Sequence, residues 1–201
     1  MLVALTLALG VGNSTQCTGS SSNLDADECS AWISLYDATG GATWRNCAPN
    51  RLTPCACLDG VSCTPDGKRG IHYLCVLPFT PHPSHPPRAR MLAHADPHTA
   101  PPPPSAPALS LLGENNMTGT LPAEMSAFKH LTDLDVWKND LRGLLPALDF
   151  GSISSCFLLA PAAGGTNAFL CPFPPGAVGK CKKEGSAGWV NITAADCHSA
   201  T

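Results

Sequence analysis

The chain has 201 residues, a formal net charge of -3 and only 13% charged residues, so its length suits one or two small domains. The low charge argues against nucleic acid or an anionic membrane as a partner. Its 11 cysteines are more than a reduced compartment usually retains, and they indicate an oxidising one.

Residues 1–16 carry an apolar run, Leu2 to Leu9, followed by small residues, which predicts a secretory signal peptide without a basic start. The alternatives are a buried N-terminal helix and a truncated gene start. No later run reaches the roughly 18 apolar residues of a membrane helix. We therefore expect a secreted, extracellular protein with no membrane span. Three acceptor triplets, which begin at Asn13, Asn116 and Asn191, fit this location, and we predict N-glycosylation at Asn116 and Asn191.

Residues 17–75 are rich in cysteine and end in a predicted strand, with Ile71 and Leu74 in step. The acidic cluster formed by Asp25, Asp27 and Glu28 predicts a solvated helix N-terminus. Residues 76–111 hold 11 of the 20 prolines, show no repeat pattern and predict disorder. Their histidines have tolerable metal spacing, but a disordered chain does not preorganise ligands, so we predict no metal site. These histidines are His82, His85, His94 and His98.

The sequence after this segment repeats itself. Residues 131–146 read L-x-x-L-x-V-x-x-N-x-L-x-G-x-L-P, and residues 112–122 read L-x-x-N-x-M-x-G-x-L-P. Asn115 and Asn139 are 24 positions apart, within the roughly 20–29 residues of a leucine-rich unit. A weaker third copy runs from Ile153 to Pro172. Within one unit, apolar side chains point inward from a strand, and the Asn139 amide satisfies backbone groups in the turn that follows.

This pattern resembles the plant-type leucine-rich repeat family. "WISLYDATGGATW" (residues 32–44) and "CACLDGVSC" (residues 55–63) resemble the cap that precedes such repeats. The resemblance covers about residues 25–75 and 112–175. It implies an α/β repeat fold, a short leucine-rich repeat solenoid with Cys-rich caps that is interrupted by a disordered Pro-rich insertion. Residues 112–175 would form the repeats and residues 176–201 a Cys-containing C-terminal cap or tail.

The Pro-rich segment interrupts one of these units. Deleting residues 76–111 joins Cys75 to Leu112 and restores a full unit with Ile71, Leu74 and Asn115 in place. One interpretation is a retained intron or faulty gene prediction. The other is a real loop, disordered, with partly polyproline character and glycosylation.

Eleven is an odd number, so at least one cysteine has no intramolecular partner. If neighbours in the sequence pair with each other, Cys75 is the cysteine without a partner. A zinc site at Cys55, Cys57 and Cys63 is the less favoured alternative to disulfides there. The predicted pairs are Cys17 with Cys29, Cys47 with Cys55, Cys57 with Cys63, Cys156 with Cys171, and Cys181 with Cys197.

Repeat proteins bind ligands through the concave face of their strands. The candidate residues on that face are Thr132, Asp133, Asp135, Trp137 and Lys138, with His72, Tyr73 and Glu114 from the preceding unit. We predict Asp133 and Asp135 to face solvent as an acidic patch rather than an acid/base pair. Trp137 is interpreted either as an exposed binding anchor or as a ring packed on the next strand or under a glycan.

No phosphate loop, nucleophile elbow or zinc-protease motif occurs in the sequence, so we expect neither an enzyme nor a cofactor. The resemblance implies non-catalytic recognition of an extracellular protein, peptide or glycan, with assembly with another repeat protein as a further expectation. The alternatives are a structural cell-wall or matrix protein and the truncated ectodomain of a receptor, with a secreted Cys-rich enzyme as the least favoured.

Overall fold

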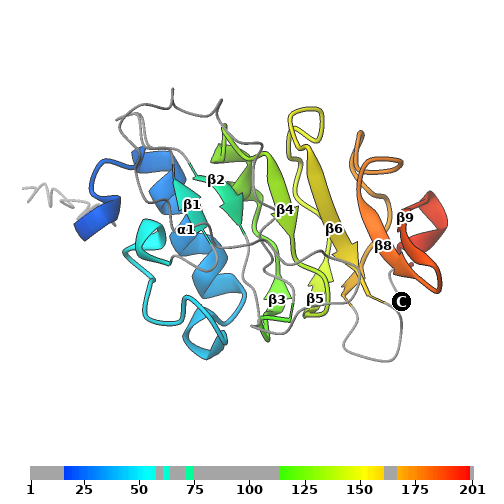
Figure 1. The fold of residues 1–201 in the computed structure, drawn as a ribbon, viewed down its shortest axis with the longest axis horizontal. Helices are drawn as coiled ribbons and strands as arrows, with labels where there is room; N and C mark the ends of the chain where they lie inside the picture. The colour runs from blue at the N-terminus through cyan, green and yellow to red at the C-terminus, as the bar shows by residue number, and fades with distance from the viewer. Residues whose placement is uncertain (1–15, 58–60, 64–70, 75–113, 161–166, 200–201) are drawn as a thin grey trace, which may run out of the picture.

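The computed structural model describes residues 16–57, 61–63, 71–74, 114–160 and 167–199 (Figure 1). The predicted signal peptide and Pro-rich segment 76–111 therefore lie outside the described residues. The same is true of Asn13 and Cys75.

Two sheets and one α-helix form the regular structure of these residues. The six-stranded sheet has the order β1-β2-β4-β6-β8-β9, and the three-stranded sheet has the order β3-β5-β7. Figure 1 shows the strands of the larger sheet in a row that leads from α1 to the C-terminal elements. The elements are α1 (Ala26–Ala38), β1 (Val61–Cys63), β2 (Ile71–Leu74), β3 (Thr118–Thr120), β4 (Asp133–Asp135), β5 (Asp140–Gly143), β6 (Ser155–Leu159), β7 (Ala168–Phe169), β8 (Lys182–Gly185) and β9 (Gly188–Asn191). Short 3₁₀ helices lie at Gly19–Ser21, Gly41–Thr43, Pro54–Ala56, Ala123–Ala127 and Ala194–Asp196.

The predicted fold class, a leucine-rich repeat solenoid with Cys-rich caps, is wrong. The described residues form two small sheets with one helix, and the larger sheet is mixed, because β1 and β9 run antiparallel to their neighbours. The clear repeat covers only residues 112–146. The outer strands come from sequence without that repeat and are fixed by disulfides and by the β8–β9 pairing, which the 24-residue spacing does not encode.

The inner strands of both sheets are parallel, and their inward side chains share one core. Leu134 of β4 and Cys156 of β6 are neighbours in register, and both are buried. Leu141 of β5 and Phe169 of β7 are fully buried on the other sheet and belong to the same apolar cluster. This packing fixes the positions of the turns that leave β4, where the candidate site lies.

Buried asparagines hold these turns. The Oδ1 atom of Asn139 accepts from the N–H groups of Asn115 and Met117, at 3.1 and 2.9 Å. Its Nδ2 donates to the carbonyls of Val136 and Trp137, at 2.9 and 3.2 Å. The predicted role of the Asn139 amide is therefore confirmed. Asn167 acts similarly, since it accepts from Leu141 and donates to Val136 and Leu158.

The N-terminal unit covers one end of the core with α1. The Asp25 carboxylate caps the helix by accepting from the Asp27 N–H at 2.9 Å. Trp32 on its inner face is fully buried and meets Trp44 edge-to-face, with ring centroids 5.7 Å apart. Such aromatic pairs add about 1 kcal/mol beyond their buried area.

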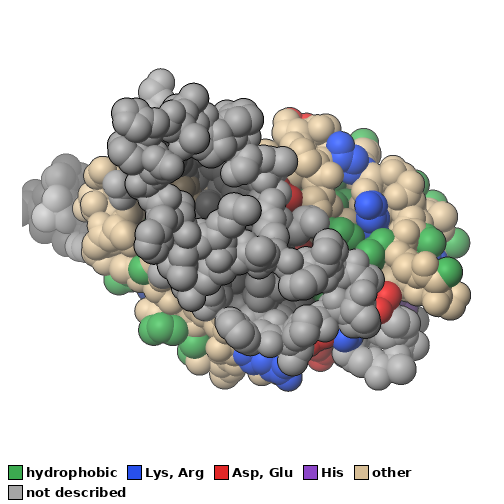
Figure 2. All heavy atoms as spheres, viewed as in Figure 1, with side chains coloured by type: hydrophobic (Ala, Val, Ile, Leu, Met, Phe, Trp, Pro, Cys, Tyr) green, Lys and Arg blue, Asp and Glu red, His purple; other side chains and the backbone are tan. Residues whose placement is uncertain are grey.

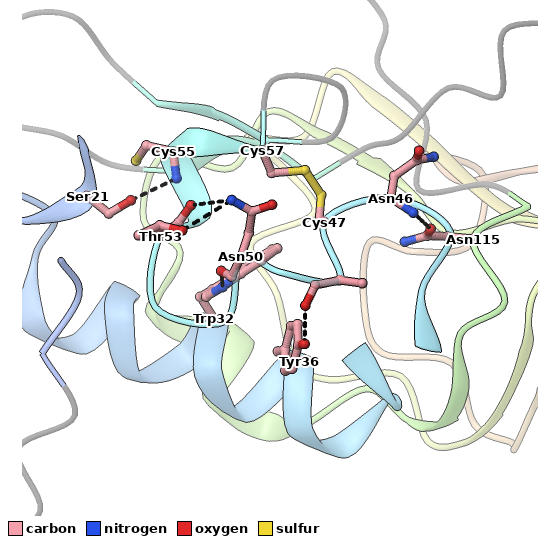
Figure 3. The surroundings of a disulfide bond; sticks show 11 residues. Ser21, Trp32, Tyr36, Asn46, Cys47, Asn50, Thr53, Cys55, Cys57 and Asn115 are labelled. Atoms are coloured by element: carbon pink, nitrogen blue, oxygen red, sulfur yellow. Dashed lines mark hydrogen bonds between the residues drawn. A yellow bond between two sulfur atoms is a disulfide. The ribbon is translucent and has the colours of Figure 1, made fainter. Parts of the chain in front are cut away.

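The loop after α1 is held against the helix and against the second half of the chain (Figure 3). The Trp32 indole donates to the Asn50 carbonyl at 3.0 Å, and the Tyr36 hydroxyl donates to the Ala48 carbonyl. The Asn46 N–H donates to Asn115 Oδ1 at 2.9 Å. This last bond places the loop beside the turn that precedes β3.

All ten cysteines in the described residues form disulfides. The pairs are Cys17–Cys29, Cys47–Cys57, Cys55–Cys63, Cys156–Cys181 and Cys171–Cys197. The prediction is confirmed for disulfide bonding and for the first pair, and it is wrong for the other four pairings. Strands β6 and β8 are parallel neighbours in the sheet, and this pairing brings Cys156 next to Cys181. Pairing sequence neighbours ignores such contacts.

Glu28 corrects a second expectation, because it is buried rather than solvated at the helix start. One oxygen accepts from the Ile71 N–H at 2.9 Å, and the other has no hydrogen-bond partner. Desolvation by burial raises the pKa of this carboxyl above its ordinary value of 4.5, although the Ile71 N–H and the His130 charge oppose the rise.

A raised carboxyl pKa means that the folded state holds the proton more tightly than the unfolded chain does. The free energy of unfolding of the native chain should therefore fall, relative to Glu28→Gln, as the pH rises from about 4.5 through the folded-state pKa. Urea unfolding of both proteins between pH 4 and pH 8 tests this. Glu124→Gln, at an exposed position, controls for the loss of one negative charge. A constant difference between the native chain and Glu28→Gln across this range would contradict the prediction.

Candidate functional site

The strand residues predicted to face solvent are buried. Asp133 and Asp135 are 3% and 2% exposed, and Trp137 is 5% exposed, so that part of the prediction is wrong. Trp137 packs edge-to-face on Trp189 of β9, with ring centroids 5.1 Å apart. The ring centroid of Phe157 of β6 lies 4.4 Å from that of Trp189. Trp137 is a packed ring, as the alternative interpretation held. Its replacement by alanine should therefore lower the stability of the fold rather than remove an exposed binding contact.

Asp135 is the most constrained of the predicted carboxylates. Its Oδ1 accepts from the Trp137 N–H at 3.4 Å, and its Oδ2 is buried without a hydrogen-bond partner. Burial raises the pKa of this carboxyl well above its usual range, because no cation offsets the desolvation. Asp135 therefore contributes no accessible charge to an acidic patch.

Thr132 and Asp133 lie at the other end of β4. The Thr132 hydroxyl donates to Asp133 Oδ2 at 2.7 Å, and Thr132 is half-buried. Tyr73 is placed by register, opposite Asp133 in the β2–β4 pair. The structure therefore separates these three residues from the turn that carries Lys138.

Glu114 and Lys138 are the two predicted site residues that the structure brings together in accessible positions. They are 24 positions apart, and Lys138 Nζ lies 2.5 Å from Glu114 Oε1. The ammonium also lies 4.5 Å from the centroid of the Trp137 ring, which adds a cation–π contact. Both side chains are about one quarter exposed.

A pocket of about 350 Å³ opens beside this ion pair. It is lined by Arg45, Glu114, Asn116, Met117, Lys138, Asn139 and Asp140. The turns that precede β3 and β5 supply most of the wall, and the bond between Asn46 and Asn115 brings in Arg45 from the N-terminal unit. The pocket is thus built from parts of the chain far apart in sequence.

The backbone of the pocket wall is strained. Glu114, Asn116 and Lys138 have φ angles of 59°, 60° and 49°, in the left-handed region that non-glycine residues rarely adopt. Each such residue costs about 1 kcal/mol or more and persists where the surrounding structure holds it. Here the Asn139 bonds to the two turns hold them. Strain of this kind clusters at binding sites.

The chemistry of the pocket suits binding by polar contacts. Asp140 is paired with Arg142 at 2.9 Å, and Glu114 is paired with Lys138. Arg45 is exposed and forms no ion pair with another described residue. The described residues contain no cluster of three or more His, Cys, Asp or Glu that could hold a metal ion.

Sequence reasoning missed Arg45 and Asp140 and assigned Asn116 only as a glycan acceptor. Asn116 and Asn191 are both exposed in the structure. Asp140 follows the predicted turn asparagine directly and could have been found by extending the candidate face through the turn. No local signal marks Arg45, because its place depends on a bond between residues 69 positions apart.

No family model matches the chain, and no curated protein matches it. Among the described residues no helix is long and apolar enough to cross a membrane. The five disulfides are compatible with an extracellular location.

Proposed function

We propose that the chain is a secreted, non-catalytic recognition module that binds a polar segment of an extracellular protein, peptide or glycan. The observation that carries this proposal is the pocket beside Glu114 and Lys138, where side chains of both charges and amides line one opening. Resemblance to the plant-type leucine-rich repeat family, which rests on residues 131–146, supports the same class of function.

The charges in the pocket favour particular ligand groups. Glu114 and Lys138 form one ion pair, and Asp140 and Arg142 form another, so the charges within each pair neutralise one another. Arg45 leaves one guanidinium with donors for a carboxylate or for neighbouring hydroxyl groups of a ligand. The ligand class is therefore a peptide or sugar unit with such oxygens and without a strong net charge.

Arg45→Ala should weaken binding of such a ligand about tenfold or more, equivalent to about 1.4 kcal/mol. The side chain is exposed, so its loss should leave the melting temperature nearly unchanged. The test is to screen the purified protein against peptide and glycan arrays and to titrate the strongest ligand into the native chain and the variant by calorimetry.

Arg51→Ala is the matched control, because the Arg51 side chain is 41% exposed and is paired with Asp37 outside the pocket. It should leave the affinity unchanged. Equal binding by the Arg45 variant, with its fold retained, would remove the pocket as the site. Absence of any ligand on both arrays would count against the recognition function itself.

A further inference from the structure

Asn116 occupies the rim of the pocket and is also a potential glycan acceptor. It lines the opening together with Arg45 and Lys138, and its side chain is exposed. The amide nitrogen donates to the Thr43 carbonyl at a long 3.4 Å, so little is lost when this bond breaks. Asn116-Met117-Thr118 is an acceptor triplet, and its threonine is exposed at the start of β3.

From this juxtaposition we propose that an N-linked glycan on Asn116 controls access to the pocket. The proposal rests on the proposed function, because it concerns regulation of the same site. A glycan core of several sugar rings is larger than any side chain that lines the opening. Its first sugar would be attached to a residue that lines the pocket, so the proposal places the chain of sugars close to Lys138 and Arg45, which line the same opening.

The modification is a group transfer, in which an oligosaccharide moves from a lipid diphosphate to Asn116. The bond between Asn116 Nδ2 and C1 of the first sugar forms, and the bond from C1 to the phosphate oxygen breaks. The diphosphate leaves on its lipid carrier, and the amide proton is released. The donor is supplied by the secretory compartment that the five disulfides fit.

The second described triplet provides an internal comparison. Asn191, at the end of β9, is exposed like Asn116 but does not line the pocket. Thr193 in this triplet donates its hydroxyl to Asp196 at 3.0 Å. A glycan at Asn191 should therefore have no effect on the pocket, although the transfer chemistry is the same.

The test uses acetylation of lysines by a small N-hydroxysuccinimide ester, which needs no knowledge of the ligand. The full chain is secreted from a eukaryotic host, and glycopeptides are mapped by mass spectrometry. Lys138 should be acetylated several-fold more slowly in the Asn116-glycosylated protein than in Asn116→Gln or Thr118→Val. The rate at Lys129, exposed outside the pocket, should be the same in all of them, and Asn191→Gln should behave as the native chain.

An unmodified Asn116 in the secreted native chain would overturn the inference. Equal acetylation of Lys138 with and without the glycan would do so as well. The two variants remove the acceptor in different ways, so agreement between them excludes an effect of either substitution on the fold. Slower labelling of Lys138 combined with no ligand on the arrays would support the control of access and defeat only the proposed function.

Discussion

Replacing Asn139 by alanine is expected to lower the free energy of unfolding by about 4 kcal/mol, since four hydrogen bonds of about 1 kcal/mol each are lost. The side chain is 3% exposed, so water cannot replace its bonds without opening the turn. Two N–H groups and two carbonyls lose this side-chain partner. The strained residues Glu114 and Lys138 lie in the turns that it holds, so the pocket should be lost with the stability.

Urea unfolding, followed by far-ultraviolet circular dichroism with the disulfides intact, measures this effect. Asn23→Ala at an exposed position is the control and should change stability by less than about 0.5 kcal/mol. If Asn139→Ala loses less than about 1 kcal/mol, the asparagine does not hold the turns.

The role of Asn139 could be predicted because it depends on local spacing. An asparagine that follows a short strand at a fixed offset has its carbonyl partners within the same turn, and Val136 and Trp137 are three and two positions away. The 24-residue spacing also identified Asn115, which bonds through its N–H to Asn139. These contacts recur along the chain, so the sequence pattern contains them.

The burial of Asp133, Asp135 and Trp137 could not be predicted in the same way. Alternation along β4 correctly separates their side chains from Leu134, but it does not show what covers the second face. Trp189 arrives there on β9, 52 positions after Trp137, through the antiparallel β8–β9 pair. On the face shown in Figure 2, basic and hydrophobic side chains lie close together over the region of β6 and β8.

The pocket was only half predictable for a related reason. Glu114 and Lys138 follow from the repeat, and they meet because the two turns stack. Arg45 comes from a loop whose position depends on the Cys47–Cys57 disulfide and on the Asn46–Asn115 bond. Connectivity of this kind is set by the folded geometry, and four of the five pairings were missed for that reason.

Removal of residues 76–111 is expected to raise the free energy of unfolding by about 3 kcal/mol. Leu74 is in register with Leu134, and Asn115 is bonded to Asn139, so the two pairs hold equivalent places. Leu74 and Asn115 are 41 positions apart, whereas Leu134 and Asn139 are five apart, and the difference is the 36 residues of the segment. Closing the shorter connection is less costly by about 2 kcal/mol in chain entropy.

The remaining gain comes from the Asn115 amide, whose Nδ2 is buried without a hydrogen-bond partner. In the joined chain Leu112 should take the place that Val136 has beside Asn139, and its carbonyl should accept from Asn115 Nδ2, contributing about 1 kcal/mol. Stability is measured by urea unfolding of the full chain and of the chain that joins Cys75 to Leu112. An equal rate of Lys138 acetylation in the two proteins would show that the pocket is preserved.

A deletion of residues 77–111 is the matched control, because it removes almost the same length but leaves Val76 and shifts Leu112 by one position. In this variant Val76 takes the inward position two residues after Leu74, and Asn115 follows Leu74 by six residues instead of five, so Asn115 would lose its place in the turn. This variant should be less stable than the 36-residue deletion, although the two deletions shorten the connection by almost the same length. Equal stability of the two deletions would show that only loop length matters, and the equivalence of Leu74–Asn115 with Leu134–Asn139 would then be without consequence for the fold.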